Sequence, residues 1–317
     1  KGEKTALIEG VKAGFEDQLF KHLAEVADPG EIDYIILNHT EPDHSGALAA
    51  LREKMPRAQV VASKTAVMFL SRMLHKEFNH QVVGHGEEID LGGRTLRFIA
   101  APFLHWPDSM FTYVPEAKVL FTCDVFGRHY CSGEMFDDLE DDPGDSFKYY
   151  YDVIMSPFGK YVLEALDKIK DLDLEVICPS HGPVLRRDIQ SCVAFYRKWA
   201  TREKPSDGRK QVPVIYTSAY GYTGLLAGEI AIGLAEAGVA AELLEIGKYP
   251  KEELVEKINA SDGFIIGSPT INRDAVPPVW ELLAHVNVLV NKDKPAAAFG
   301  SYGWSGEAVK LIEQRLQ

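Results

Sequence analysis

The sequence lacks the features of membrane, secreted and nucleic-acid-binding proteins. No apolar run approaches the roughly 20 residues of a membrane-spanning helix, and the first residues do not resemble a signal peptide. The net charge of -13 argues against a nucleic-acid surface, because phosphate binding needs clustered lysine and arginine. We therefore expect a cytoplasmic protein that binds neither membranes nor nucleic acid.

Cysteine is scarce and its pattern excludes several kinds of site. The four cysteines (Cys123, Cys131, Cys178 and Cys192) include no Cys-x-x-Cys pair. This argues against a disulfide framework, a zinc ribbon and a rubredoxin-like iron site within the chain. Free thiols in a reducing compartment account for all four.

The length and composition predict two globular domains. The chain has 317 residues, of which 46% are hydrophobic and 26% charged. A charged segment with a proline and a glycine, Thr201–Gln211, separates two differently patterned halves and is typical of a linker. We predict domains over residues 1–205 and 206–317.

The two halves predict different α/β architectures. The first half mixes helices with short strands, including a strand at Tyr34–Leu37 and hairpins over Glu88–Ala100 and Met110–Thr122, which suggests two sheets covered by helices. The second half alternates apolar strands with helices, which predicts a doubly wound parallel sheet. Its four expected strands are Val212–Tyr216, Ala240–Glu245, Gly263–Ile266 and Ala296–Phe299.

A cluster of potential metal ligands directly follows the first of the buried strands. His39, Glu41, Asp43 and His44 fall within six residues, so we expect a loop to wrap them around one or two cations. Three further candidates follow the ends of later strands: His105, Asp124 and His181. A rigid sheet can bring such loops together at one site.

The other residues near these ligands carry weaker signals. A second carboxylate or a backbone group usually orients a metal-bound imidazole, but the sequence does not identify it among neighbours such as Trp106 and Asp108. His129 is a candidate for such a supporting role. The run Tyr149–Tyr151 either places a phenol near the site or serves aromatic packing, and we favour packing. The remaining histidines are expected to be solvated: His22, His75, His80, His85 and His285.

Three loops in the second half have the pattern of a phosphate and ring-binding site. Thr217–Gly224 is a turn rich in hydroxyls and glycine that leads into a helix, where free N–H groups and the helix dipole favour an anion. It contains neither Gly-x-Gly-x-x-Gly nor a P-loop lysine, which argues against a dinucleotide or a nucleoside triphosphate. Gly267–Arg273 and Gly300–Gly306 follow the third and fourth strands, at the edge where open α/β sheets bind ligands.

These motifs together resemble those of flavodiiron proteins. The metallo-β-lactamase superfamily carries a His-x-His-x-Asp-His loop, and Glu41 replaces the second of these histidines here. The His-x-Glu-x-Asp-His variant is similar to that of the flavodiiron family. The resemblance covers nearly the whole chain. It implies an αββα lactamase-like sandwich followed by a flavodoxin-like doubly wound parallel sheet, with both ends of the chain apparently truncated.

The resemblance also implies two non-haem irons. One would be held by His39, Glu41 and His105, and the other by Asp43, His44 and His181, with Asp124 bridging the two. Family members differ in whether the residue at His44 touches metal. Four imidazoles and three carboxylates form a harder, more anionic ligand set than a histidine-rich zinc site, which suits a redox iron pair.

FMN is the second cofactor that the resemblance implies. The phosphate would be taken by Ser218, Tyr220, Gly221 and Thr223, and the ring by Pro269, Thr270, Asn272, Tyr302, Gly303 and Trp304. The expected FMN-binding set is completed by Ala219, Tyr222, Ile271 and Ser301. The first loop departs from the commonest family form, with Thr217, Tyr220 and Tyr222 where Asp, Trp and Ser are frequent.

The implied activity joins the two halves of the chain. FMN would receive electrons from rubredoxin or a reduced deazaflavin and pass them to the iron pair, which would reduce dioxygen to water or nitric oxide to nitrous oxide; we favour dioxygen. A head-to-tail homodimer, or a dimer of such dimers, is implied as well. Two alternatives remain: a zinc hydrolase that carries a flavodoxin domain, which Glu41 disfavours, and an electron carrier with a vestigial metal domain, which the complete ligand set disfavours.

Overall fold

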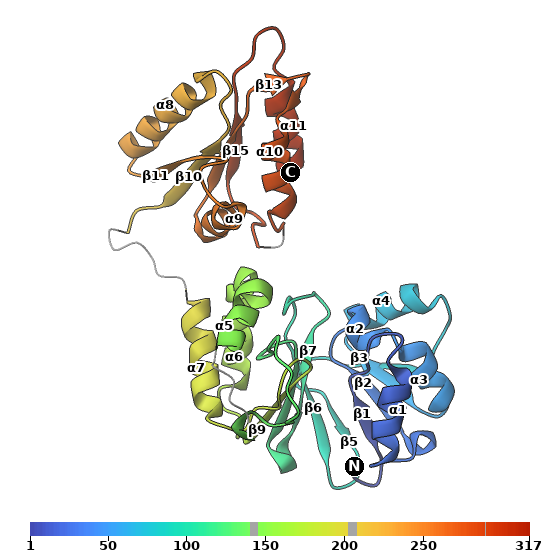
Figure 1. The fold of residues 1–317 in the computed structure, drawn as a ribbon. Coiled ribbons are helices and arrows are strands. Elements are labelled where there is room, and N and C mark those ends of the chain that lie inside the picture. The colour runs from blue at the N-terminus through green and yellow to red at the C-terminus, as the bar shows by residue number, and fades with distance from the viewer. Residues whose placement is uncertain (140–144, 202–207, 289) are drawn as a thin grey trace. The chain divides into compact units, whose positions relative to one another are not determined.

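The computed structural model describes residues 1–139, 145–201, 208–288 and 290–317. The chain forms two compact units, Lys1–Thr201 and Arg202–Gln317 (Figure 1). The predicted boundary between residues 205 and 206, and most of the predicted linker, lie outside the described residues, so this boundary stays a prediction. Within the described residues, no helix is both long enough and apolar enough to span a bilayer.

The first unit begins with a parallel sheet that packs against helices on one face. Its strands, in spatial order, are β1 (Ala6–Ile8), β2 (Tyr34–Leu37), β3 (Gln59–Ala62) and β4 (His80–Val82). Because side chains of a strand alternate between faces, Ile35 and Leu37 of β2 pack with residues of the helices α1 (Glu16–Ala24), α3 (Leu48–Lys54) and α4 (Lys64–Leu74). Ile36 points the other way, into the cluster shared with the second sheet.

The second sheet of this unit supplies the other half of that core. Its strands, in spatial order, are β5 (Glu88–Asp90), β6 (Thr95–Ala100), β7 (Met110–Val114), β8 (Val119–Cys123) and β9 (Val176–Pro179). Neighbouring strands from β5 to β8 are antiparallel, and β9 is parallel to β8. Gly92 and Gly93 have positive φ angles between β5 and β6, as a tight hairpin turn requires. Both predicted hairpins are therefore confirmed.

Helices cover the outer faces of both sheets. Figure 1 shows α5 (Asp145–Tyr150), α6 (Gly159–Ile169) and α7 (Ile189–Ala200) beside the second sheet, on the side away from the first. Short helical turns connect the elements: Pro29–Glu31, Pro115–Ala117, Asp137–Leu139, Tyr151–Met155 and Ser156–Phe158. The unit is thus the predicted αββα sandwich.

The second unit is the predicted doubly wound parallel sheet. Its strands lie in the order β11 (Ala240–Glu245), β10 (Gln211–Tyr216), β12 (Phe264–Gly267) and β15 (Ala296–Phe299). A buried cluster joins one face to α9 (Lys251–Ala260), α10 (Pro277–His285) and α11 (Glu307–Leu316), and Figure 1 shows α8 (Tyr222–Glu236) on the other face. The strand order reverses between β10 and β12, where such sheets bind ligands.

Two details differ from the elements predicted from sequence. The apolar pattern of Lys4–Val11 predicts one strand, but the observed strand ends at Ile8 because Glu9 takes the left-handed conformation, with φ of 65°, which interrupts an extended strand. A small hairpin, β13 (Thr270–Ile271) and β14 (Asp274–Ala275), follows β12 and was not expected. Both features lie at a candidate site.

We predict that Phe98→Ala destabilises the first unit by about 3–5 kcal/mol, because Phe98 of β6 is fully buried between the two sheets. Val82→Ala on β4 is the matched control, since Val82 is 46% exposed and should cost roughly 0.5 kcal/mol or less. Urea unfolding followed by hydrogen exchange and mass spectrometry can assign the change to the first unit. Equal effects of the two substitutions would contradict this assignment of the core.

Candidate metal centre and flavin pocket

The seven predicted metal ligands converge at one end of the sandwich. His39 and Glu41 follow β2, His105 follows β6, Asp124 follows β8 and His181 follows β9. The expectation that the whole first cluster is a loop was wrong. Asp43 and His44 lie on the one-turn helix α2 (Pro42–Ser45), which begins at a proline whose fixed φ suits the first helical position.

Four of the seven residues form a first group. The ligand atoms of His39, Glu41, His105 and Asp124 all lie within 4.8 Å of one another. Nε2 of His105 is 3.0 Å, and Nε2 of His39 3.3 Å, from Oε2 of Glu41. Nε2 of His39 is also 3.5 Å from Oδ2 of Asp124. Two imidazoles and two carboxylates therefore surround one position.

The other three residues form a second group beside the first. The ligand atoms of Asp43, His44 and His181 lie within 4.8 Å of one another. Nε2 of His181 is 3.2 Å from Oδ2 of Asp43, and Nε2 of both His44 and His181 is 3.2 Å from Oδ1 of Asp124. Asp124 thus turns Oδ2 towards the first group and Oδ1 towards the second, which is the orientation that a bridging carboxylate needs.

The donor set fits a pair of cations. Asp124 is only 2% exposed, and a buried carboxylate is stable only when it is compensated. Oδ1 of Asp43 and Nε2 of His44 are buried, and neither makes a hydrogen bond of acceptable geometry among the described residues, although Nε2 of His44 lies 3.2 Å from Oδ1 of Asp124. Such unsatisfied buried atoms are rare, and coordination of a metal ion would satisfy both. That these residues bind metal stays a proposal.

In the metal-free protein, the protonation state of each of these side chains depends on the charges of its neighbours. Burial disfavours protonation of His39 and His44, but close contacts with neighbouring carboxylates outweigh this effect and raise the pKa of His39 to about 9 and that of His44 to about 11. Burial also disfavours ionisation of Asp124, yet the imidazoles of His181 and His44 hold the pKa of this carboxyl well below its usual range. Without metal, positive charge on these imidazoles therefore compensates the negative charge of Asp124. A bound cation could provide the same compensation.

Asp108 is a supporting residue whose partner the sequence did not reveal. Its carboxylate is buried, with both oxygens 3.3 Å from Nδ1 of His39, and it accepts hydrogen bonds from the backbone N–H (2.8 Å) and hydroxyl (2.7 Å) of Thr40. Contact with Nδ1 fixes the His39 ring with Nε2 towards the first group. Asp108 lies close to His105 in sequence but supports a different ligand, because the loop after β6 packs against the loop after β2.

The tyrosine run contributes a phenol to the site, which we had not favoured. The hydroxyl of Tyr150 is 3.5 Å from Oδ1 of Asp124 and the residue is buried. Aromatic packing is the role of Tyr151, which lies against Tyr196. His129 packs on Tyr150, with ring centroids 4.7 Å apart, and belongs to neither ligand group. The five histidines expected to be solvated are all exposed.

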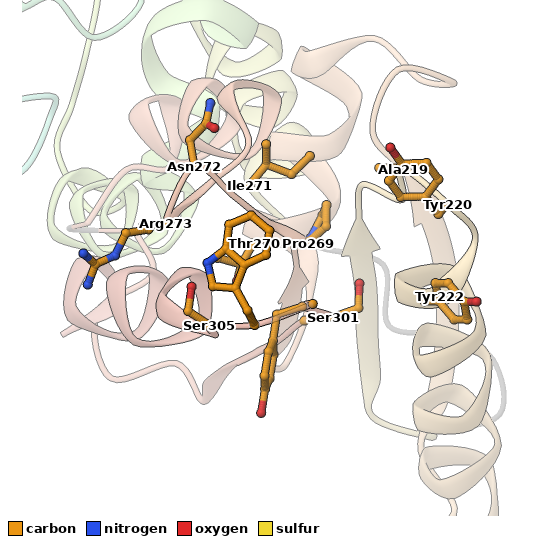
Figure 2. A pocket seen from close by; sticks show the side chains of 14 residues that line it. Ala219, Tyr220, Tyr222, Pro269, Thr270, Ile271, Asn272, Arg273, Ser301 and Ser305 are labelled. Carbon is orange, nitrogen blue, oxygen red and sulfur yellow. The ribbon is translucent and has the colours of Figure 1, made fainter.

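The second unit contains a cavity of about 640 Å³ at the C-terminal ends of its central strands. Figure 2 shows Tyr222 at the start of α8 and Arg273 of the unexpected hairpin on opposite sides of this cavity. All three predicted loops line it, and eleven of the fourteen predicted FMN-binding residues take part: Ala219, Tyr220, Tyr222, Pro269, Thr270, Ile271, Asn272, Ser301, Tyr302, Gly303 and Trp304. Arg273, Gly300 and Ser305 line it too, beyond the predicted set.

The three remaining predicted residues shape the first loop instead of lining the cavity. The Ser218 hydroxyl accepts a hydrogen bond from the backbone N–H of Gly224 (3.2 Å), and the Thr223 hydroxyl bonds that of Ser301 (2.8 Å). Gly221 has φ of 87° immediately before α8, a conformation that favours glycine. The loop is thus held at the N-terminus of a 15-residue helix, where an anion is favoured.

Exposed aromatic side chains border the cavity. Trp304 is 88% exposed and Tyr220 89%, and Tyr222 and Tyr302 are also largely exposed. Apolar ring faces in water are unfavourable, and several of them around one concave site indicate a planar aromatic ligand. The cavity therefore has an anion-favouring helix terminus on one side and aromatic rings around it.

Comparison with known proteins agrees with both units. The family model described as ODP family beta lactamase matches residues 1–182, and the flavodoxin model matches residues 214–317. The chain is 44% identical to the flavo-diiron protein FprA2 of Clostridium acetobutylicum and 37% identical to the nitric oxide reductase of Moorella thermoacetica. The alignments cover 100% and 99% of this chain and 81% and 79% of those proteins.

The solved structures give the same result for the fold. The rubredoxin oxygen:oxidoreductase of Desulfovibrio gigas is 31% identical, with a TM-score of 0.69 over 100% of this chain and 80% of that one. Fold and site together define a protein that joins a lactamase-type metal-site domain to a flavodoxin domain. The chain belongs to the flavodiiron protein family.

We predict that the metal-free protein loses thermal stability as the pH rises from about 6.5 to about 9. The folded-state pKa values of His39 (about 9) and His44 (about 11) lie above the ordinary 6.5, so their stabilising contribution is complete below pH 6.5 and is lost as the pH passes each raised value. Differential scanning calorimetry of chelator-treated protein across this range measures the effect. A His44→Ala variant should show a flatter profile, and an unchanged wild-type Tm would contradict the prediction.

We predict that Trp304→Ala weakens FMN binding by about 2- to 12-fold, because an aromatic stacking partner contributes about 0.5–1.5 kcal/mol. Tyr249→Ala is the matched control, since Tyr249 is a partly exposed aromatic of the same unit outside the cavity. Flavin fluorescence titration of the FMN-free protein gives both affinities. A similar loss for both variants would indicate that Trp304 has no specific contact with the flavin.

Proposed function

We propose that this protein is a flavodiiron oxidoreductase, in which FMN in the second unit supplies electrons to a non-haem diiron site in the first. The observation that carries the proposal is Asp124, whose two carboxylate oxygens each face a separate group of histidine and carboxylate ligands. The names of two relatives, a nitric oxide reductase and a rubredoxin oxygen:oxidoreductase, support reduction of a diatomic gas.

In this proposal His39, Glu41 and His105 would hold one iron, Asp43, His44 and His181 would hold the other, and Asp124 would contribute one carboxylate oxygen to each group. When bound, the iron pair supplies the redox chemistry and the positions at which a diatomic gas binds. The three carboxylates offset the charge of two cations. Asp108 holds the ring of His39, and the Tyr150 phenol donates to Oδ1 of Asp124, so the ligand geometry is set before metal binds.

The reaction balances with either gas. Dioxygen takes four electrons and four protons to give two waters, and two nitric oxides take two electrons and two protons to give nitrous oxide and one water. We favour dioxygen as the substrate. Steady-state turnover on the two gases with the same electron donor tests this choice, and faster turnover on nitric oxide would overturn it.

The FMN site of the proposal is the 640 Å³ cavity of the second unit. The Thr217–Gly224 loop at the start of α8 takes the phosphate, since its backbone N–H groups and the helix terminus favour an anion. The loops after β12 and β15 contact the ring, with Trp304 and Tyr302 as aromatic partners. Glycine is needed at Gly300, where a Cβ atom would lie 2.1 Å from the carbonyl oxygen of Ser268.

The partners and location form a further part of the proposal. The name of the Desulfovibrio gigas relative supports rubredoxin as the electron donor, and a reduced deazaflavin is the alternative. We propose a head-to-tail homodimer, alone or paired as a dimer of dimers, and a cytoplasmic location. Reduction of the bound FMN by each purified donor, and light scattering of the intact protein, test the donor and the oligomeric state.

Metal and flavin content distinguish the proposal from its two rivals. Elemental analysis and the visible spectrum of the purified protein should give two irons and one FMN per subunit. Two zincs would favour a hydrolase that carries a flavodoxin domain, and flavin without metal would favour an electron carrier. A glutamate in place of a histidine at Glu41 weighs against zinc hydrolysis, because zinc has no redox state to stabilise.

We predict that Glu41→His lowers gas reduction by at least about 10–100-fold and leaves FMN content unchanged. The substitution removes a carboxylate ligand of the first group, and even changes to residues that only support a ligand cost about this much. Glu87→Gln is the control, since the Glu87 carboxylate accepts from the backbone N–H of Gly84 away from the ligand groups. Full activity of the Glu41→His variant would contradict the role of Glu41.

A further inference from the structure

We propose that Glu9 is a positioning residue that fixes the ring of His44, so that Nε2 of this histidine is directed into the second metal group. The inference rests on the proposed diiron function and deepens it, because it concerns one candidate ligand of the second group. Glu9 is not among the seven ligands, and its short distance to His44 appears only in the folded chain.

Glu9 links the beginning of the ligand cluster to His44. Its side chain is only 13% exposed. Oε1 accepts a hydrogen bond from the backbone N–H of Asn38 (2.7 Å). Oε2 lies 3.4 Å from Nδ1 of His44, outside hydrogen-bond geometry, and this buried oxygen has no hydrogen-bond partner among the described residues. The backbone N–H of Glu9 bonds the carbonyl of Ile36 in β2 (2.8 Å), so the residue is fixed at both its backbone and its carboxylate.

The neighbouring glycine permits this close contact. A Cβ atom on Gly10 would lie 2.6 Å from the carbonyl oxygen of His44, a distance at which one of the two backbones must move. The backbone just after β1 therefore lies against the backbone of α2 at Gly10. The pair Glu9-Gly10 combines a left-handed residue that ends the strand with a residue that leaves space for the His44 backbone.

The carboxylate of Glu9 can influence which ring nitrogen of His44 carries the proton. A neutral imidazole carries a proton on one nitrogen and a lone pair on the other. An ionised carboxylate can only accept, so the approach of the otherwise unpartnered Oε2 to Nδ1 favours the tautomer with the proton on Nδ1 and the lone pair on Nε2. Nε2 faces Oδ1 of Asp124 at 3.2 Å and Oδ2 of Asp43 at 3.6 Å, where the second metal would sit.

Glutamine cannot perform the same task. Both oxygens of Glu9 face donors, the Asn38 N–H and the His44 ring, and a glutamine has only one oxygen to offer. With that oxygen on Asn38, its NH₂ group would face Nδ1 and favour the opposite tautomer. Cys123 is the other neighbour, with Sγ 3.6 Å from Nδ1, but a thiol is a weak partner.

Glu9 thus does for the second group what Asp108 does for the first. Each is a buried or nearly buried carboxylate that contacts Nδ1 of one histidine, His44 or His39, and accepts from a backbone N–H of the ligand cluster. The carboxylates come from opposite sheets, one after β1 and the other after β6. Each group therefore has one imidazole held from outside the metal site.

The test compares Glu9→Gln, His44→Ala, the double variant and the control Cys123→Ala in the iron-loaded, FMN-containing protein. Iron per subunit is titrated against a competing chelator, and Mössbauer spectra with ⁵⁷Fe distinguish the two irons. Glu9→Gln should weaken one iron by about 10–100-fold and leave the other iron and FMN in place. The double variant should be no worse than His44→Ala, because Glu9 acts through His44. Cys123→Ala should leave both irons.

Either an unchanged iron affinity in Glu9→Gln or additive losses in the double variant would overturn the proposal. A further measurement uses the wild-type protein, so its result does not depend on whether the variants fold. In zinc-substituted protein, ¹⁵N NMR of His44 should show the proton on Nδ1, and a proton on Nε2 would overturn the proposal. Absence of iron and FMN from the protein as purified would instead count against the proposed function, which separates the two failures.

Discussion

The site in the first unit depends on one buried charge, the carboxylate of Asp124. Four imidazoles, those of His39, His44, His105 and His181, have Nε2 within 3.8 Å of its oxygens. A carboxylate that is 2% exposed can stay ionised only with such compensation. The candidate ligands lie on α2 or follow β2, β6, β8 and β9, so both sheets must hold their observed positions for this charge to be satisfied.

Asn38 shows how the two sheets are kept in place at the site. Its carbonyl accepts from the backbone N–H of Met110, and its side-chain oxygen accepts from the hydroxyl of Thr112, so it joins β2 to β7. Its backbone N–H bonds Glu9, which reaches His44. One residue at the end of β2 thereby connects the packing of the sandwich with the orientation of a ligand.

The site in the second unit has a different structural origin. Among the described residues of this unit no charged residue is buried. The cavity follows from strand order, because the strand order reverses between β10 and β12. The loops after β10, β12 and β15 meet at that edge. Its aromatic residues are exposed, so this site is a surface that a planar ligand would cover, in contrast with the buried metal centre.

The sequence by itself determined most of the elements and the seven candidate ligands that the fold brings together. Local signals suffice for these: a proline and glycines at turns, apolar runs for strands, and His39 to His44 packed into one short segment after a strand. Only the tertiary structure decided which residues support them. Glu9, Asp108 and Tyr150 act on partners between 26 and 69 residues away, and nothing in their local sequence specifies those partners. Such contacts arise when strand ends from two sheets meet, which is a property of packing and not of any segment alone.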